Sequence, residues 1–485
     1  MMKRLVRREL WTQTAIAVVL LCAHFLAPCG FLTSCELLAQ SSQLNSTARP
    51  EALPEIVSNV VSKEAPNGVK DKHTPVRFLG DRLPDKPTIA PSFTIPVTAL
   101  GFTAPVPRSF GQQISLASLD FLGDGHILFT FRVPGLIRRE AAQNGKEDER
   151  QIQAVVLDVK TGRVEAEALW TVHDYLRYLW MLKDGHFLLR DRDGLQQGDS
   201  SLVLKPLLQF PGPVAWLEMD PQQLYMVTNS HEPAKVEARP GQVSSPPTAA
   251  ATIAADDQNA SAPADKADSA PPDTVVRIFE RSTGKVMLVS RTRSTVHLPI
   301  NAGGYLEALR GNGPMWVVNL SYFTGGSRIV GRVDSTCSPV YDFVSQSEFL
   351  VKACASGGNR LVAFTTDGRR LWEDGMASSE IWPITVASPD GSRLARETLQ
   401  ASRPVNPNNA LDLDDVKGQW VRIINAADGN VALEATANPP LDAGGNVAIS
   451  PTGRRVAILI DGAIQVFELP PAPALPGPTT APAAG

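Results

Sequence analysis

A strand-turn-strand pattern returns along most of the chain, and this repetition is the strongest constraint on its fold. The stretch "ITVASPDGSRLAR", which starts at Ile384, shows an apolar-rich strand, a polar turn and a second strand. Asp-Gly and Gly-Asn-Gly turns supply the positive φ angles that tight hairpins need. The chain is therefore predicted to be an all-β protein built from repeated units. Seven such hairpins start at Leu119, Leu179, Trp216, Glu307, Tyr341, Ile384 and Asn446.

Most of these hairpins are followed by a second strand pair with its own turn, as in "VVRIFERSTGKVMLVS" from Val275. Two hairpins form one four-stranded antiparallel sheet, and the spacing of about fifty residues between units is typical of a propeller blade. Blades arranged around an axis bury both faces of each sheet against their neighbours. We predict a β-propeller of seven four-stranded blades, with six or eight blades or two stacked β-domains as alternatives. The last unit is one strand short, and we expect residues Phe93 to Phe102 to complete it.

The repeats can be compared with a known family. Hairpins with an "SPDG" turn, together with strand pairs joined by turns such as "DVKTG", resemble the YVTN and WD-repeat-like propellers of bacterial exported proteins. The resemblance covers the repeat region, from Ser109 to Leu469, and it lies in the repeat pattern alone. It implies the fold and does not imply a function.

The N-terminal residues have the layout of an export signal. The basic stretch "MMKRLVRREL" is followed by an apolar run that extends to about Leu32. We assign residues 1–41 to an export signal or membrane anchor. Three outcomes stay open: cleavage after the small residues of "LLAQS", lipidation of Cys35 in "LTSC", and retention as an uncleaved anchor. Each of them places the remainder in the periplasm or cell envelope of a bacterium.

Three segments lack the strand pattern and are rich in Pro, Ala, Ser or Asp. Such composition buries too little apolar surface to offset the entropy lost on ordering. We predict a low-complexity linker at 42–91, a disordered insertion at 231–273 and a disordered tail at 470–485. The propeller then spans 92–469.

The insertion separates the second and third strands of its unit, and the connections at 133–150 and 399–418 occupy the same position in theirs. Equivalent connections of antiparallel blades open at the same end of a ring. Because binding residues concentrate on loops held by a rigid scaffold, we expect this end to bind a partner.

The charge balance argues against a nucleic-acid partner. Lys and Arg number 46 against 50 Asp and Glu, the formal net charge is -4, and no large basic block follows the first ten residues. We expect an exported, non-catalytic binding or scaffold module for a protein, a glycan or an envelope component. We expect a monomer that needs no cofactor and that contacts the membrane through its N-terminal segment or a lipid on Cys35.

The body of the protein contains two cysteines, Cys337 and Cys354, and an even number in an oxidising compartment predicts a disulfide. The intervening stretch "SPVYDFVSQSEFLVKA" reads as a hairpin, which places the two residues opposite or diagonal on adjacent strands. The alternative is a pair of buried free thiols.

Few residues follow the patterns of metal or catalytic sites. His126 and His186 follow Asp-Gly turns in successive units, a whole blade apart, so we interpret them as solvated surface residues. The acidic stretch "LDLDD" at Leu411 to Asp415 lacks the glycine and closing glutamate of a calcium loop. The chain has no Gly-x-Ser-x-Gly elbow and no clear phosphate-binding glycine loop, so we assign no catalytic and no metal-binding residue.

Two enzyme classes remain as alternatives. The stretch "FTTDGRRLWE", which ends at Glu373, resembles the strand-pair motif of quinoprotein dehydrogenase propellers, in which tryptophans dock one blade on the next. The resemblance implies a periplasmic oxidoreductase with a quinone-type cofactor as one alternative, although Trp372 is almost alone at that spacing here. The other is a propeller hydrolase or lyase whose polar residues converge only in the fold. Charged or aromatic groups around a cavity at the ring axis would favour an enzyme, and a narrow channel filled with small side chains would favour the binding module.

Overall fold

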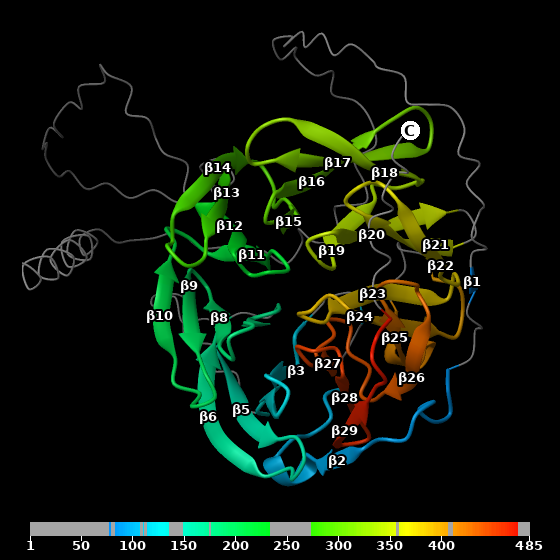
Figure 1. Ribbon diagram of the computed structural model, residues 1–485. Coiled ribbons are helices and arrows are strands. Elements are labelled where there is room, and N and C mark those ends of the chain that lie inside the picture. The colour runs from blue at the N-terminus through cyan, green and yellow to red at the C-terminus, as the bar shows by residue number, and fades with distance from the viewer. Residues whose placement is uncertain are drawn as a thin grey trace, which may run out of the picture. The chain divides into compact units, whose positions relative to one another are not determined.

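Seven sheets follow one another around a central axis in the computed structural model of the chain (Figure 1). Each blade contains four antiparallel strands, and the strand that begins each blade lies nearest the axis. The prediction of an all-β propeller with seven blades is therefore confirmed. The structure describes residues 77–78, 83–106, 110, 114–134, 149–173, 176–232, 273–355, 358–405 and 411–473.

Blades 1 to 6 are formed by strands in chain order. Blade 1 comprises β3 (Ala117–Leu122), β4 (His126–Arg132), β5 (Arg150–Asp158) and β6 (Val164–Val172). Blade 2 comprises β7 (Leu179–Met181), β8 (Phe187–Asp191), β9 (Gly194–Gly198) and β10 (Lys205–Gln209). Blade 3 comprises β11 (Val214–Met219), β12 (Tyr225–Glu232), β13 (Asp273–Glu280) and β14 (Val286–Thr292).

Blade 4 comprises β15 (Ile300–Asn301), β16 (Gly304–Arg310), β17 (Met315–Tyr322) and β18 (Ser327–Asp334). Blade 5 comprises β19 (Val340–Phe343), β20 (Glu348–Ala355), β21 (Gly358–Thr365) and β22 (Arg370–Gly375). Blade 6 comprises β23 (Glu380–Ala387), β24 (Arg393–Ala401), β25 (Val416–Asn425) and β26 (Val431–Ala437). Blade 7 comprises β27 (Val447–Ile449), β28 (Arg455–Ile460), β29 (Ala463–Glu468) and β2 (Phe93–Pro96). Among the described residues, the helical segments are two short 3-10 turns, η2 (Thr98–Leu100) and η4 (Leu413–Asp415).

Glycine supplies the backbone conformation of the tight turns that begin several blades. Gly185, between β7 and β8, has φ of 78°, and Gly391, between β23 and β24, has φ of 75°. Residues with a Cβ rarely adopt these angles, so the turns depend on glycine. The Asp-Gly hairpin pattern thus produced the turns that it predicted.

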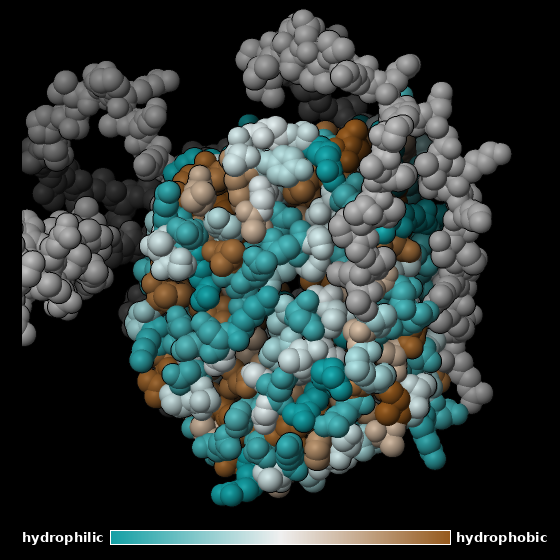
Figure 2. Space-filling view, viewed as in Figure 1, coloured by the Kyte–Doolittle hydropathy of each residue, from teal (hydrophilic) through white to brown (hydrophobic). Residues whose placement is uncertain are grey.

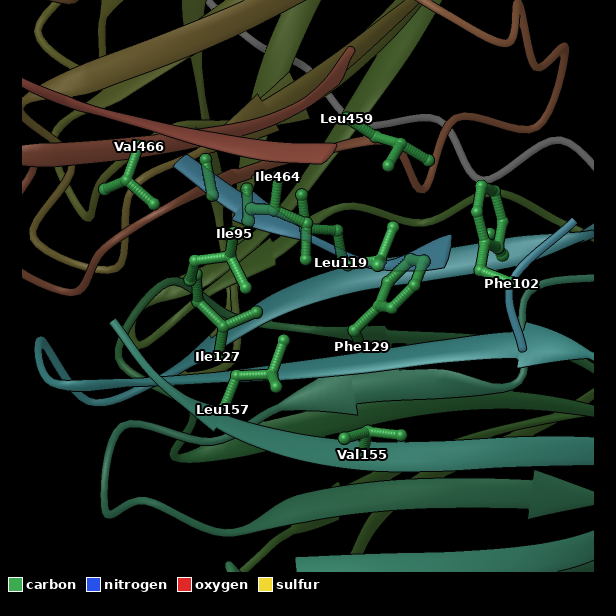
Figure 3. Close-up of a cluster of buried hydrophobic side chains, with 14 of the residues drawn as sticks. Ile95, Phe102, Leu119, Ile127, Phe129, Val155, Leu157, Leu459, Ile464 and Val466 are labelled. Carbon is green, nitrogen blue, oxygen red and sulfur yellow. The ribbon is translucent and has the colours of Figure 1, made fainter. Parts of the chain in front are cut away.

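The N-terminal strand β2 closes the ring by completing blade 7. It pairs antiparallel with β29, and Ile95 lies opposite Ile464. Ile95 is 4% exposed and belongs to a cluster of buried side chains from β2, blade 1 and blade 7 (Figure 3). The prediction that a strand between Phe93 and Phe102 completes the last blade is confirmed. Closure therefore joins the two ends of the repeat region through backbone pairing and apolar burial.

Residues that precede β2 run along the outer strands of blades 5 and 6. A two-residue strand, β1 (Arg77–Phe78), pairs parallel with β22 as a fifth strand of that sheet. Further along, the Thr88 amide donates to the Glu434 carbonyl at 2.9 Å, and the Glu434 amide donates to Thr88 Oγ1 at 3.0 Å. This part of the segment that we assigned to the 42–91 linker is attached to the ring, because an outer strand has unpaired backbone groups to offer.

Several expectations concern residues outside the described ranges. These are the export segment with Cys35, most of the linker, and nearly all of the insertion and the tail. In the part of the chain that the structure describes, no helix has the length and apolar character of a membrane span.

Blade 4 corrects one detail of the sequence reading. The repeat pattern predicts that the hairpin from Glu307 forms the first two strands of its unit, but the second and third strands, β16 and β17, form it. The innermost strand, β15, consists of Ile300 and Asn301 alone, and Asn301 lies opposite Gly304. A strand this short shows no period-two pattern, so no sequence signal indicates it.

Blade 6 has a polar interior that the sequence did not lead us to expect. All residues of β24 are buried, although the strand includes charged side chains. Arg396 lies directly opposite Arg422 on β25, and both are fully buried. Glu380 separates the two like charges: its Oε2 accepts from Arg396 Nη2 at 2.7 Å, and its Oε1 accepts from Arg422 Nη2 at 2.5 Å. Asp374 of blade 5 also pairs with Arg396, so this network joins blades 5 and 6.

The other face of β24 carries a buried carboxyl group. Glu397 Oε2 accepts a hydrogen bond from Gln419 Nε2 at 2.8 Å, and Gln419 Oε1 accepts one from Asn446 Nδ2 of the chain that leads into blade 7 at 2.7 Å. Burial raises the pKa of Glu397 to about 8, and the bond from Gln419 offsets only part of that effect.

Candidate functional site

Three acidic residues occupy similar positions in the innermost strands of alternate blades. They are Asp120 in β3, Glu218 in β11 and Asp342 in β19. On β11 the neighbouring Leu217 is buried in the core, whereas Glu218 and Trp216 extend from the opposite face. The alternation of a strand thus keeps apolar side chains between the blades and directs the acids away from that core.

Two basic residues fall between these acids in the sequence. Arg177, which precedes β7, interacts electrostatically with Asp120 and with Glu218. His297, which precedes β15, has Nδ1 at 3.2 Å from Glu218 Oε2 and Nε2 at 3.1 Å from Asp342 Oδ1. We call these five residues the axial charge chain, because their signs alternate across the inner strands of blades 1 to 5.

The axial charge chain lies in an enclosed environment that solvent still reaches. Arg177 has an exposed surface, yet burial by surrounding protein lowers its pKa. Asp120 is partly accessible, and burial raises its pKa although Ser118 donates a hydrogen bond to it. Protein therefore surrounds much of each side chain, while part of it stays accessible to solvent.

His297 is held as an imidazolium. Burial alone would lower its pKa, but the carboxylates of Asp342 and Glu218 outweigh that effect and raise the pKa to about 11. Burial would raise the pKa of Asp342, but the bond with His297 and the charge of Lys352 lower it to about 2. The ring of Trp216 meets the imidazole edge to face, with centroids 5.5 Å apart. At neutral pH His297 therefore has no lone pair with which to accept a proton.

Glu218, His297 and Asp342 are close enough to suggest a metal site, but their arrangement does not suit one. Their candidate ligand atoms lie within 4.8 Å of one another. The two carboxylates, however, address opposite nitrogens of the same ring, whereas a metal needs its ligands to converge on one point. The backbone carbonyl of Tyr341 also lies 2.8 Å from His297 Nε2, which is consistent with a donating N–H there. The arrangement fits charge pairing better than metal coordination.

The histidines that the sequence singled out do not share a site. His126 Nε2 lies 3.0 Å from Glu165 Oε2, and His186 Nδ1 lies 3.2 Å from Asp184 Oδ1. They belong to adjacent blades, and both side chains are well exposed. In the acidic stretch before β25, Asp415 binds the Arg403 guanidinium, with Oδ2 at 2.8 Å from Nη2.

Trp372 and the two cysteines have structural positions. Trp372 Nε1 donates to the carbonyl of Ala426 in blade 6 at 2.7 Å, so this side chain docks one blade on the next. This is the blade-to-blade contact that the resemblance implies for Trp372. Cys337 and Cys354 are bonded, with Cα atoms 5.6 Å apart, and they connect the segment after β18 to the end of β20.

The sequence reasoning missed the axial charge chain, although a signal for part of it was present. Single acidic residues interrupt otherwise apolar first strands in "SLDFL", "WLEMD" and "VYDFV", which contain Asp120, Glu218 and Asp342. Comparing equivalent positions across repeats would have found them. Arg177 and His297 lie in connections without a repeat pattern, so only the fold reveals them.

The connections between the second and third strands are much longer in three blades than in the other four. The second and third strands are joined through 133–149 in blade 1, 233–272 in blade 3 and 402–415 in blade 6. The same connections in blades 2, 4, 5 and 7 are 192–193, 311–314, 356–357 and 461–462. Because the strands alternate in direction, all seven connections emerge at one end, which we call the loop-rich end. The face visible in Figure 2 has hydrophilic side chains interspersed with separate hydrophobic ones.

No family model matches the chain, and no curated protein matches it. Solved structures with similar folds include an acylaminoacyl peptidase from Pyrococcus horikoshii, at 10% identity and a TM-score of 0.39, covering 74% of this chain and 52% of the peptidase. The chain thus spans about half the length of that peptidase. The C-terminal WD40 domain of Sif2 has 8% identity and a TM-score of 0.36, with 76% of this chain and 98% of that domain covered. The β-propeller domain of the Trilobed protease from Pyrococcus furiosus has 10% identity and a TM-score of 0.37, with 75% of this chain and 100% of that domain covered. TM-scores this low carry no argument about function.

Proposed function

We propose that this protein is an exported binding propeller that holds a protein or glycan partner, or another envelope component, at its loop-rich end. The observation that carries the proposal is that the strand ends joined by the three long connections, 133–149, 233–272 and 402–415, all lie at one end of the ring. Four other blades use two-to-four-residue links in the same position, so the length is not needed to connect the strands. A rigid ring that presents long connections on one end is a common architecture for recognition.

The chemistry of the axial charge chain supports binding. His297 is bonded on both sides by carboxylates, so it stabilises an electrostatic network and is not available as a general base. Trp216 is 40% exposed beside it, which offers an aromatic surface next to charged groups. Such a combination is suited to holding a polar ligand.

Photo-crosslinking tests the proposal. The full chain is expressed in its native host with a photoreactive residue in place of Asp414. Asp414 is exposed in the 402–415 connection at the loop-rich end. The matched control replaces Thr283, which is exposed in the turn between β13 and β14 at the opposite end. We expect one discrete crosslinked species from position 414 and none from position 283. Equal or no crosslinking at the two positions, in protein recovered from the envelope, would contradict the proposal.

A propeller hydrolase or lyase is the second candidate, and one observation favours it: acidic residues extend from the inner strands of blades 1, 3 and 5, with Trp216 beside one of them. Asp120 is the group best suited to donate a proton, because burial raises its pKa. The test incubates the protein with envelope glycans and peptides and compares it with Asp120→Asn. Turnover that the variant abolishes would replace the binding proposal with an enzymatic one.

A further inference from the structure

A cavity opens between blades 4 and 5, away from the axial charge chain. Its volume is about 270 Å³, and we call it the rim pocket. It is lined by residues of β17 and β18 on one side and of β21 and β22 on the other: Met315, Arg332, Val333, Asp334, Arg360, Val362, Arg370 and Glu373. Met315 begins β17 and Asp334 ends β18, so this side of the rim pocket adjoins the loop-rich end.

Three guanidinium groups from three different strands line the rim pocket. They belong to Arg332 on β18, Arg360 on β21 and Arg370 on β22, against the two carboxylates of Asp334 and Glu373. The lining therefore has an excess of positive charge. Arginine is the side chain best suited to bind carboxylate and phosphate groups, because its planar fork offers parallel N–H donors.

Glu373 forms ion pairs with two of these arginines, Arg360 and Arg370. Its side chain is 3% exposed, and its Oε1 lies 3.4 Å from Arg360 Nη1. Arg370 pairs with the same carboxylate. One buried acid thus orients two guanidinium groups whose own side chains remain 45% and 46% exposed. Arg332 is exposed as well, and within the described residues it makes no ion pair.

The disulfide stabilises the walls of the rim pocket. Cys337 follows Asp334 closely, and Cys354 lies opposite Asn359, the residue before Arg360. Ser335 reinforces the same region, since its Oγ donates to the Cys337 carbonyl at 2.7 Å and accepts from the Cys354 amide at 3.0 Å. The two strands that supply Arg332 and Arg360 are therefore held together before any ligand binds, which lowers the entropic cost of binding.

We propose that the rim pocket binds an oxyanion group, a carboxylate or a phosphate, on a ligand of about monosaccharide size. Arg332 supplies the unpaired donor, Arg360 and Arg370 supply oriented donors, and Val333 and Val362 supply apolar wall. The cavity volume of about 270 Å³ lies just below the usual range for ligand pockets, so it accommodates one charged group with its carrier ring. This inference rests on the proposed function in that it names the chemistry of a partner bound near the loop-rich end.

Titration of the full chain with small anions tests the inference. The probes are glucuronate, sodium acetate, inorganic phosphate and, as the neutral analogue, glucose, followed by isothermal titration calorimetry and by chemical shifts of arginine side chains. We expect saturable binding of at least one anion and none of glucose. Preference for glucuronate over acetate and phosphate identifies a sugar acid as the source, and preference for phosphate identifies a phosphoryl group.

Variants separate a specific site from general charge attraction. Arg332→Ala should weaken anion binding about tenfold, because a charge-assisted bond is lost. Arg332→Lys should restore part of it, since the charge returns without the fork. Arg293→Ala removes another exposed arginine, directly after β14, that does not line the rim pocket, and it should leave binding unchanged.

The inference is overturned by the absence of saturable anion binding in the correctly folded protein, or by equal weakening in Arg332→Ala and Arg293→Ala. These failures are distinguishable from failure of the proposed function. Loss of crosslinking at position 414 with intact anion binding refutes the binding role of the loop-rich end alone, and the reverse result refutes the rim pocket alone.

Discussion

Replacing Ile95 with alanine tests whether β2 holds the ring closed. Ile95 is 4% exposed and packs within a cluster that joins β2, blade 1 and blade 7 (Figure 3). It also contacts the turn at Gly162, where a Cβ would lie 3.2 Å from Ile95 Cγ2. Removing a buried isoleucine side chain costs about 2–5 kcal/mol, through lost transfer free energy and the cavity left behind. Because neighbours from three elements limit how far the site can collapse, we expect about 3 kcal/mol.

Urea unfolding followed by tryptophan fluorescence measures this loss. The matched control is Thr94→Ala, an exposed position on the same strand, which should change the free energy of unfolding by less than about 0.5 kcal/mol. Hydrogen exchange provides a second reading: the Ile95→Ala change should speed exchange in β29, the partner of β2, more than in β25. Equal unfolding midpoints for Ile95→Ala and Thr94→Ala would refute the assignment of closure to this strand.

Three further predictions concern titrating groups and the disulfide. The carboxylates beside His297 raise its pKa to about 11, so its charge pairing stabilises the fold fully below pH 6.5 and loses that effect as the pH rises toward 11. The difference in the free energy of unfolding between wild type and His297→Asn, measured by urea unfolding, should therefore shrink between pH 6.5 and pH 11. Burial raises the pKa of Glu397 to about 8, so the folded state retains a proton that the unfolded state releases above pH 4.5. The melting temperature of Glu397→Gln should therefore equal that of wild type near pH 4 and exceed it above pH 8. The intact mass should increase by two hydrogens when the Cys337–Cys354 bond is reduced, and identical masses before and after reduction would show free thiols. The double variant Cys337→Ser with Cys354→Ser should lower the free energy of unfolding by about 3 kcal/mol.

Local patterns predicted much of the fold because each hairpin is specified by residues close in sequence. The period-two alternation and the glycine turns indicated seven units, and a missing strand in the last unit indicated closure by residues near Phe93. The reading failed at β15, where Ile300 and Asn301 are too few to show a period. It also failed at β24, where Arg396 and Glu397 look like surface residues until the adjacent blades cover them.

The candidate sites were less predictable, because their residues come from different blades. The positions of Asp120, Glu218 and Asp342 could have been inferred by comparing repeats, but their pairing with His297 depends on which side chains meet near the axis. The rim pocket likewise depends on how blade 4 packs against blade 5, and no local pattern near Arg332 indicates it.

Hydrophobic alternation and turn glycines, which act over a few residues, predicted the turns, seven repeated units and the strand that closes the ring. The folded ring then selected seven blades over six or eight. The folded ring alone shows that Arg177 and His297 interact with acids of alternate blades. It alone also shows that Arg332, Arg360 and Arg370 line one cavity. The physical reason is that charge pairing and cavities arise from contacts between side chains distant in sequence, whose distances are set by the packing of whole sheets.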